Sequence, residues 1–298
     1  MQQISGFHFD TYNTITADCD RGLLEKCMAA CVRYERIFSK TIPGSEVWQL
    51  NHAGGRPVPL GEDMQRVLRA SLELYAASEG AFNVAVGALM ALWNFKSETP
   101  KLPEEAALRA ALEKSDASRI ELDGAAARLP EGMEIYPGGI AKGYIADRVA
   151  DMLREGGAET ALLNFGGNIV TTGPKPDGSP WHIGLQSPGG TWGEDYWAVT
   201  SLERGTVVTS GVYERGFELG GRRYHHILDP RTGYPAESGL LSVTIRGEDS
   251  MLADGLATAA LVLGAEKGVA LAARFGCQAI ALKEDGRSLR SRDFPLLQ

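Results

Sequence analysis

Long apolar runs and cysteines are both scarce in this chain of 298 residues. No segment approaches the roughly 18 consecutive apolar residues that a membrane-spanning helix needs, so we expect no transmembrane segment. The four cysteines do not have the spacing of a disulfide-rich scaffold. Cys27 and Cys31 lie four residues apart in a helical pattern, and no further ligands nearby suggest a zinc site. We expect both to be buried small side chains.

Basic residues are also fewer than acidic ones. The chain has 30 Lys and Arg residues against 38 Asp and Glu residues, which gives a net charge of −8. Because phosphate backbones are bound by clustered basic side chains, we expect no nucleic-acid partner. An acidic protein can still bind a phosphate ligand through a local device, such as a helix N-terminus, a glycine-rich loop or a metal ion.

The N-terminal segment lacks the features of an export signal. Residues 1–15 contain neither a basic region nor an apolar region of the kind that signal peptides have. As the sequence stands, we therefore expect a cytoplasmic protein. The alternative is a periplasmic or membrane-anchored protein whose N-terminus has been trimmed, and both interpretations fit the sequence.

The hydrophobic content of 44% is sufficient for a sizeable core. Periodicity predicts helices over residues 20–37, 45–50, 62–79, 104–115, 143–156, 250–263 and 266–275. Alternating segments predict strands over residues 7–16, 119–122, 127–129, 160–164, 168–172, 181–186, 197–202, 206–210, 217–219, 240–246 and 278–283. No linker divides the chain, so we expect one α+β body over residues 1–298, with mixed or antiparallel sheets and flanking helices.

A glycine-rich segment precedes the predicted helix at residues 143–156. It reads Tyr-Pro-Gly-Gly-Ile-Ala-Lys-Gly-Tyr over residues 136–144. Paired glycines before a helix allow the backbone to approach a phosphate, and Lys142 adds a positive charge. The alternative is an ordinary glycine-rich helix entry, because the segment is not a Walker sequence.

Two further motifs combine turn residues with polar side chains. Residues 163–169 form a strand, a Gly-Gly turn and a second strand, in which Asn164 either reaches a ligand or caps the turn. Residues 225–235 contain His226, which can act as a base near neutral pH. Asp229 either orients this histidine or starts the Pro-Arg-Thr-Gly turn that follows it.

A candidate cation site lies near the end of the chain. Asp254 and Thr258 are four residues apart and therefore share one face of a helix. A carboxylate and a hydroxyl suit a hard cation such as Mg²⁺. The alternative is a dipole-favoured aspartate and a threonine bonded to its own helix. Ser210, in the Thr-Ser-Gly segment, lacks the surroundings of a nucleophile elbow, so ligand contact or turn chemistry is expected there.

These motifs occur in an order that resembles the ApbE family, the FAD:protein FMN transferases. The resemblance spans nearly the whole chain. The matching segments are Phe-Ser-x-x-x-Pro-x-Ser-Glu…Leu-Asn (38–51), Gly-x-Leu-x-x-x-Trp-x-Phe (87–95), Gly-Gly-Ile-Ala-Lys-Gly (138–143), Asn-x-Gly-Gly-Asn-Ile (164–169), Thr-Ser-Gly (209–211), His-Ile-x-Asp-Pro-Arg-Thr-Gly (226–233) and Ala-Asp-x-Leu-Ala-Thr (253–258).

The resemblance implies an ApbE-like fold with an FAD cleft between two subregions and Mg²⁺ on the FAD phosphates. It assigns Asp254, Thr258 and the Gly139 carbonyl to the metal, and His226 to the role of catalytic base. The residues expected to bind FAD are Phe9, Ala88, Leu89, Met90, Tyr136, Lys142, Asn164, Gly166, Gly167, Ser210 and Ile227.

The chain departs from the family pattern at several ligand contacts. Tyr136-Pro137 replaces the usual Asp-Leu, Phe9-Asp10 replaces Met-Gly, Thr41 stands where Tyr is frequent, and Asn83 stands where Asp is common. These changes spare the metal and histidine motifs. We therefore expect retained chemistry with altered ligand contacts, in which Phe9 or Tyr136 supplies aromatic surface.

The implied reaction is Mg²⁺-dependent transfer of FMN from FAD to a Thr or Ser flavinylation site on an acceptor protein, with release of AMP. One alternative is an FAD pyrophosphatase, in which water replaces the acceptor hydroxyl. Another is a flavin-binding protein without turnover.

Overall fold

A large antiparallel sheet organises the molecule in the computed structural model, which describes residues 1–95, 97 and 99–297. Its strand order over these residues is β1-β2-β6-β7-β10-β13-β14-β15, and each neighbouring pair is antiparallel. The strands are β1 (Gln2–His8), β2 (Thr11–Ala17), β6 (Ala161–Phe165), β7 (Asn168–Thr171), β10 (Gly205–Gly211), β13 (Leu240–Gly247), β14 (Gln278–Lys283) and β15 (Ser288–Arg290).

Smaller sheets flank this one. They are β16-β9-β8, with β8 (Trp181–Gln186), β9 (Tyr196–Leu202) and β16 (Leu296–Leu297); β11-β12, with β11 (Gly216–Leu219) and β12 (Arg222–His225); and β3-β5-β4, with β3 (Val58–Pro59), β4 (Glu121–Asp123) and β5 (Ala126–Arg128). The sequence did not predict β1, β3, β12, β15 or β16, because most of them are short and none shows a clear alternation of its own.

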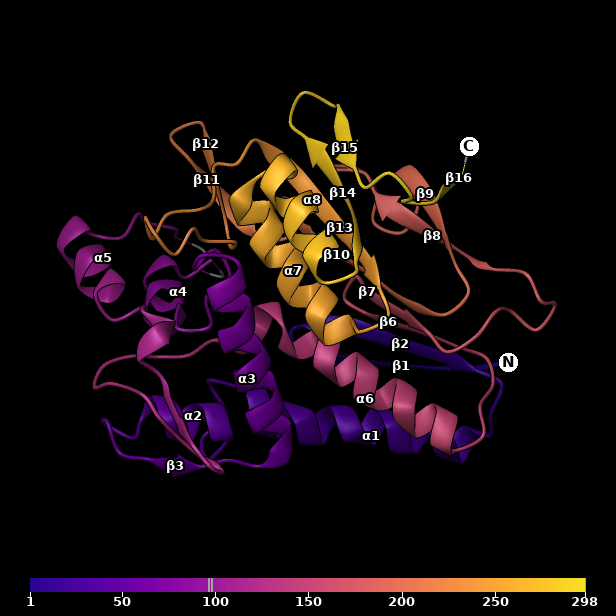
Figure 1. The fold of residues 1–298 in the computed structure, drawn as a ribbon, viewed down its shortest axis with the longest axis horizontal. Coiled ribbons are helices and arrows are strands. Elements are labelled where there is room, and N and C mark those ends of the chain that lie inside the picture. Colours follow the sequence, from indigo (N-terminus) through magenta and orange to yellow (C-terminus); the bar gives the residue numbers. More distant parts are fainter. Residues whose placement is uncertain (96, 98, 298) are drawn as a thin grey trace.

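Helices cover one face of the large sheet (Figure 1). The described helices are α1 (Arg21–Phe38), α2 (Glu46–Asn51), α3 (Glu62–Ala77), α4 (Gly87–Trp93), α5 (Glu105–Leu112), α6 (Ala141–Glu155), α7 (Ser250–Leu263) and α8 (Ala265–Arg274), with short 3₁₀ turns at Ala117–Arg119 and Pro137–Gly139. Of these, α1, α6, α7 and α8 pack on the large sheet. Helix α6 packs on β6 and β7, α7 on β10 and β13, and α8 on β14. The main hydrophobic core lies between these layers.

The predicted single strand over residues 7–16 is wrong. The segment instead ends β1, turns at Phe9 and Asp10, and begins β2, with His8 paired to Thr11. The φ angles of Phe9 and Asp10 are 57° and 59°, as a two-residue type I′ turn requires. Such turns usually carry Asn-Gly, so the Phe-Asp pair concealed the turn in the sequence. Left-handed backbone costs an L-residue about 1–2 kcal/mol, so this turn needs support from its surroundings.

The other predicted helices and strands are confirmed, with shifts of a few residues at their ends. Ser45 caps α2 by accepting a hydrogen bond from the Trp48 amide at 3.0 Å. Cys27 and Cys31 are both fully buried in the core. Among the described residues, no helix is long and apolar enough to cross a membrane.

Candidate active site

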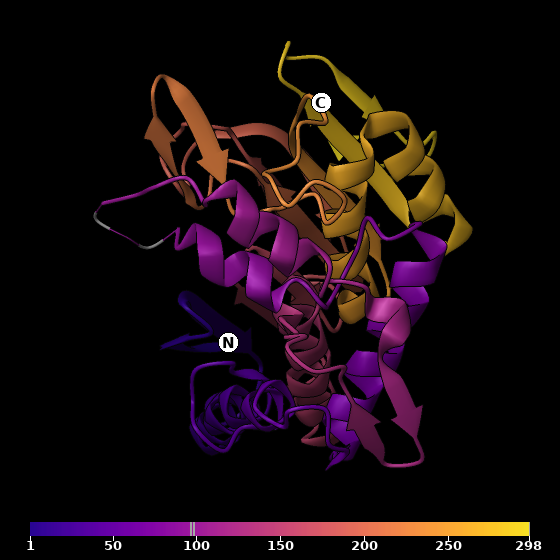
Figure 2. The ribbon, with the colours of Figure 1, turned by 90° about the vertical axis from the view of Figure 1, so that its left-hand side faces the viewer.

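A cavity of about 820 Å³ lies between segments from both halves of the chain. Figure 2 shows the orange hairpin β11–β12, the purple segment that contains α4 and the indigo N-terminal strands arranged on this side of the molecule. The lining includes these predicted site residues: Phe9, Met90, Tyr136, Gly139, Lys142, Gly166, Ser210, His226, Ile227, Asp254 and Thr258. The tertiary structure therefore brings together motifs that lie more than a hundred residues apart in the sequence.

The candidate metal residues meet at one wall of this cavity. A Cβ atom placed on Gly139 would lie 3.0 Å from Thr258 Oγ1, so the Gly139 backbone and the Thr258 side chain are in close contact. One turn earlier on α7, Asp254 is 3% exposed and its Oδ2 accepts a hydrogen bond from the Gly143 amide at 3.1 Å. The glycine-rich turn and the late helix are thus in direct contact.

The close contact between α6 and α7 depends on a second glycine. A Cβ atom on Gly143 would lie 2.0 Å from the Ser250 carbonyl oxygen. Asp147, one turn further along α6, accepts hydrogen bonds from the Ser250 and Met251 amides at 3.1 and 2.9 Å. These bonds satisfy donors at the start of α7 and fix its position relative to α6.

Positive charge already lies next to the Asp254 carboxylate. Lys142 Nζ is 3.7 Å from Asp254 Oδ1 and donates to the Gly138 carbonyl at 3.3 Å. Among the described residues, no group of three or more His, Cys, Asp or Glu side chains forms a ready metal site. A carboxylate, a hydroxyl and a backbone carbonyl nevertheless form the all-oxygen donor set that Mg²⁺ prefers, so these residues fit such an ion.

His226 lines the same cavity and is held in one tautomer. Its backbone amide donates to the Arg215 carbonyl at 3.2 Å, and its Nδ1 lies 3.3 Å from the same oxygen. A carbonyl oxygen can only accept, so Nδ1 carries the proton and Nε2 keeps its lone pair. Burial, reinforced by the Arg215 charge, lowers the pKa of His226 to about 3, so the imidazole is neutral at neutral pH.

Asp229 does not orient His226. Its carboxylate accepts from the Arg231 amide at 2.9 Å and pairs with the Arg231 guanidinium, while its backbone carbonyl accepts from Gly233 at 2.8 Å. Of the two roles that the sequence left open, the structure thus supports the turn. The neighbouring His225 also serves the backbone, because its ring bonds to the Ala236 carbonyl and the Ile227 amide.

The sequence did not point to Glu214 and Arg215, which also line the cavity. The surrounding protein raises the pKa of Glu214 to about 7, opposed by Lys142 and Arg215 and reinforced by Asp254. Glu214 is an exposed residue at the cavity lining. A Tyr-Glu-Arg run has no distinctive spacing, which is why it gave no signal.

Aromatic side chains form part of the cavity lining. The Tyr136 ring lies over Gly138, where a Cβ atom would be 2.5 Å from ring carbon Cζ, and Lys40 Nζ lies 5.2 Å from the ring centroid. Phe9 and the 60% exposed Trp192 also line the cavity. These rings offer flat apolar surface of the kind that a planar aromatic ligand needs.

Four predicted FAD contacts lie outside this lining: Ala88, Leu89, Asn164 and Gly167. Leu89 is fully buried in a small core with Trp93, and Ala88 packs against that core. Asn164 Oδ1 accepts from the Gly167 amide at 3.0 Å and so caps the Gly-Gly turn. In the same motif, Asn168 lines the cavity instead, and its buried Nδ2 has no hydrogen-bond partner among the residues that the structure describes.

Comparison with known proteins identifies close relatives. A family model described as the ApbE family matches residues 9–281. An FAD:protein FMN transferase of Klebsiella pneumoniae is 37% identical over 272 residues, which cover 89% of this chain and 81% of that protein. One from Treponema pallidum is 36% identical over 282 residues, which cover 89% and 78% of the two chains.

Solved structures agree with the sequence relatives. The crystal structure of the ApbE protein of Thermotoga maritima has a TM-score of 0.90 at 32% identity and covers 98% of this chain and 97% of that one. The apo flavinyl transferase ApbE of Pseudomonas stutzeri has a TM-score of 0.86 at 29% identity and covers 98% and 94%.

Proposed function

Because the chain belongs to the ApbE family, we propose that the cavity described above is the active site of an FAD:protein FMN transferase. The reaction moves the FMN half of FAD onto another protein. The observation that carries this assignment is the meeting of Gly139, Asp254, Thr258 and His226 in one cavity. A cation site, a base and a close backbone approach to phosphate are the parts that phosphoryl-type transfer needs.

We assign Mg²⁺ to the oxygen donors of Asp254, Thr258 and Gly139. When bound there, the ion supplies positive charge that neutralises the FAD pyrophosphate. Lys142, close to Asp254, adds a second positive charge on the same side of the cavity. The FAD contacts that line the cavity are Phe9, Met90, Tyr136, Lys142, Gly166, Ser210 and Ile227.

His226 acts as the general base in this proposal. Its Nε2 lone pair accepts the proton of a Thr or Ser hydroxyl at the flavinylation site of the acceptor protein. The hydroxyl oxygen forms a bond to the FMN phosphorus, the bond from that phosphorus to the AMP oxygen breaks, and AMP leaves.

The test is mass spectrometry of an acceptor flavoprotein after incubation with the enzyme, FAD and Mg²⁺. The acceptor should gain the mass of FMN. In the His226→Ala variant the rate should fall by about 10²–10⁴-fold, because a positioned base is lost, while FAD binding is retained. His182 is exposed on β8, away from the cavity lining, so His182→Ala is the matched control and should transfer FMN normally.

Two results would count against the assignment. No mass gain on any of several acceptors would argue against transfer. Release of FMN and AMP at the same rate without an acceptor would indicate a hydrolase that uses the same residues.

A further inference from the structure

The tip of the N-terminal hairpin combines an unfavourable backbone with a place in the cavity wall. Phe9 and Asp10 both have positive φ angles, of 57° and 59°, and neither is glycine. Phe9, Asp10 and Thr11 all line the cavity. Strained backbone persists only where surrounding contacts fix it, and it tends to occur at functional sites.

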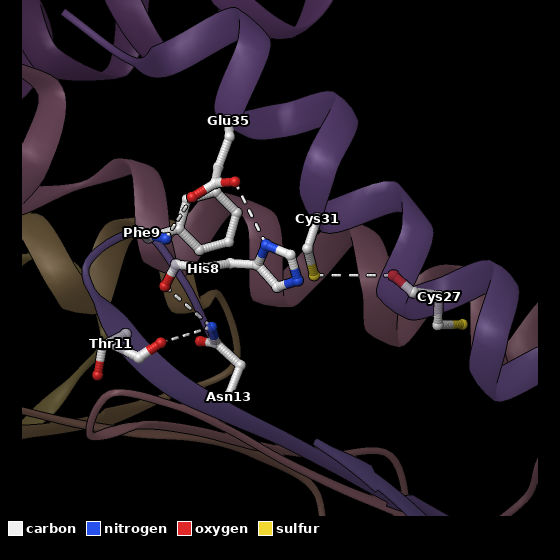
Figure 3. Close-up of polar contacts among 7 residues, drawn as sticks. All are labelled: His8, Phe9, Thr11, Asn13, Cys27, Cys31 and Glu35. Atoms are coloured by element: carbon white, nitrogen blue, oxygen red, sulfur yellow. Dashed lines mark hydrogen bonds and ion pairs between the residues drawn. The ribbon is translucent and has the colours of Figure 1, made fainter. Parts of the chain in front are cut away.

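Helix α1 supplies one of these contacts through Glu35 (Figure 3). Glu35 Oε1 accepts a hydrogen bond from the Phe9 amide at 2.7 Å, and Oε2 lies 3.3 Å from His8 Nδ1. The Phe9 amide belongs to the first left-handed residue of the turn. Its bond to the carboxylate therefore holds the backbone at the point where the strain begins.

Asn13 holds the turn from the other side. It is fully buried, and its Nδ2 donates to the His8 carbonyl at 3.0 Å and the Thr11 carbonyl at 3.1 Å. Its Oδ1 has no hydrogen-bond partner among the described residues, although an unpaired buried acceptor is unfavourable. The amide nitrogen of Asn13 therefore links the two ends of the turn, at His8 and Thr11.

The turn is connected to the candidate base through one arginine. Arg215 Nη2 donates to the Asp10 carbonyl at 3.1 Å. The Arg215 backbone carbonyl accepts from the His226 amide at 3.2 Å and faces His226 Nδ1 at 3.3 Å. A continuous series of contacts thus runs from Glu35 through the hairpin tip and Arg215 to His226.

We propose that Glu35 is a positioning residue for the transfer reaction. By fixing the Phe9–Asp10 turn, it keeps the Phe9 ring in the substrate cavity and keeps the Asp10 carbonyl where Arg215 binds it. Arg215 in turn holds His226 in its working tautomer. The role of His226 rests on the function proposed above, whereas the hydrogen bonds themselves do not.

The experiment compares Glu35→Ala with Glu35→Gln, whose amide oxygen can still accept from Phe9. Glu25→Ala is the matched control, because Glu25 lies exposed on the same helix and pairs with Arg21. In Glu35→Ala, kcat/KM for FMN transfer should fall by roughly tenfold to a hundredfold, with KM for FAD raised and kcat lowered. Glu35→Gln should keep most of the activity, and Glu25→Ala should match the wild type.

A rescue variant separates turn geometry from general damage. Glycine adopts left-handed backbone without steric cost, so Asp10→Gly favours the same turn without help from Glu35. Adding Asp10→Gly to Glu35→Ala should recover activity by several-fold relative to Glu35→Ala alone. The single variant Asp10→Gly shows how this substitution affects activity when Glu35 is present. If Glu35→Ala fails to fold, Glu35→Asp replaces it, because the shorter carboxylate keeps the charge but loses reach to the Phe9 amide.

Two outcomes would overturn the proposal. The first is wild-type KM and kcat in a folded Glu35→Ala or Glu35→Asp variant. The second is a loss that neither Glu35→Gln nor Asp10→Gly relieves, since Glu35 would then act through its charge and not through the turn. Failure of the wild type to transfer FMN would instead refute the proposed function, and FAD binding by the same variants, followed by flavin fluorescence, would still report on the turn.

Discussion

At the scale of single residues, the protonation state of Glu214 affects the charge of the cavity. Its pKa is raised to about 7, mainly by the surrounding protein, so part of the population is neutral near physiological pH. As pH rises through this range the side chain ionises and adds negative charge to a cavity that, in our proposal, binds an anionic pyrophosphate. Like charges repel, so binding of FAD without a metal ion should weaken.

We therefore expect the Kd for FAD, measured by flavin fluorescence in the absence of divalent ions, to increase by a few-fold between about pH 6 and pH 8. In Glu214→Gln the side chain cannot ionise, so Kd should change little over the same range. Glu218→Gln, on the exposed strand β11, serves as the control and should follow the wild type. Parallel curves for the wild type and Glu214→Gln would contradict this role.

Several other residues acquire their roles only from their neighbours. From the sequence, Asp229 either orients His226 or starts a turn, and Asn164 either reaches a ligand or caps a turn. The hydrogen bonds of both side chains support the turn roles. Arg215 gave no signal, yet its carbonyl fixes the His226 tautomer. A backbone carbonyl carries no sequence signature, so this contact could not be predicted.

At the scale of secondary structure, the packing of α6 against α7 places the candidate metal residues. Asp249 caps α7 locally by accepting from the Leu252 amide at 2.7 Å, and this cap agrees with the predicted helix start at residue 250. The close approach at Gly143 is a different kind of feature, because it depends on a carbonyl more than a hundred residues away.

Replacing Gly143 with Ala should force the two helices apart. The new Cβ would lie 2.0 Å from the Ser250 carbonyl oxygen, and neither group is a flexible side-chain end. We expect the free energy of unfolding to fall by about 1–3 kcal/mol or more, as measured by denaturant titration. Glu155→Ala, at the end of the same helix, should have little effect. An unchanged stability for Gly143→Ala would show that the helices separate easily.

At the scale of the whole molecule, the cavity is a junction between early and late parts of the chain. Its walls include the hairpin tip near residue 10, the glycine-rich turn near residue 139 and helix α7 near residue 254. A ligand that contacts all three binds the folded state only. Such binding raises stability by mass action.

We expect FAD with Mg²⁺ to raise the melting temperature of the protein. At free FAD of about 100 times its Kd, the free energy of unfolding should increase by about 2.7 kcal/mol. Asp254→Asn should remove most of the Mg²⁺-dependent part of the shift in melting temperature. Asp123→Asn is the control, because Asp123 is exposed at the end of β4, and this variant should retain the shift. A shift that does not depend on Mg²⁺ in the wild type would argue against a metal site at Asp254.

The sequence by itself determined most of the helices, the longer strands and the family. Helical periodicity located α1, α3, α7 and α8, because apolar spacing is a property of neighbouring residues. The ordered motifs identified the chain as an ApbE relative, since each motif is contiguous.

Only the tertiary structure decided which motif residues share the cavity and how they are held there. Leu89, an expected FAD contact, is buried in a core, and the expected first strand is two strands joined by a turn at Phe9–Asp10. Three residues that the sequence did not indicate, Glu35, Glu214 and Arg215, line the cavity. The physical reason is that burial, tautomer and turn strain depend on groups that the chain brings together only when it folds.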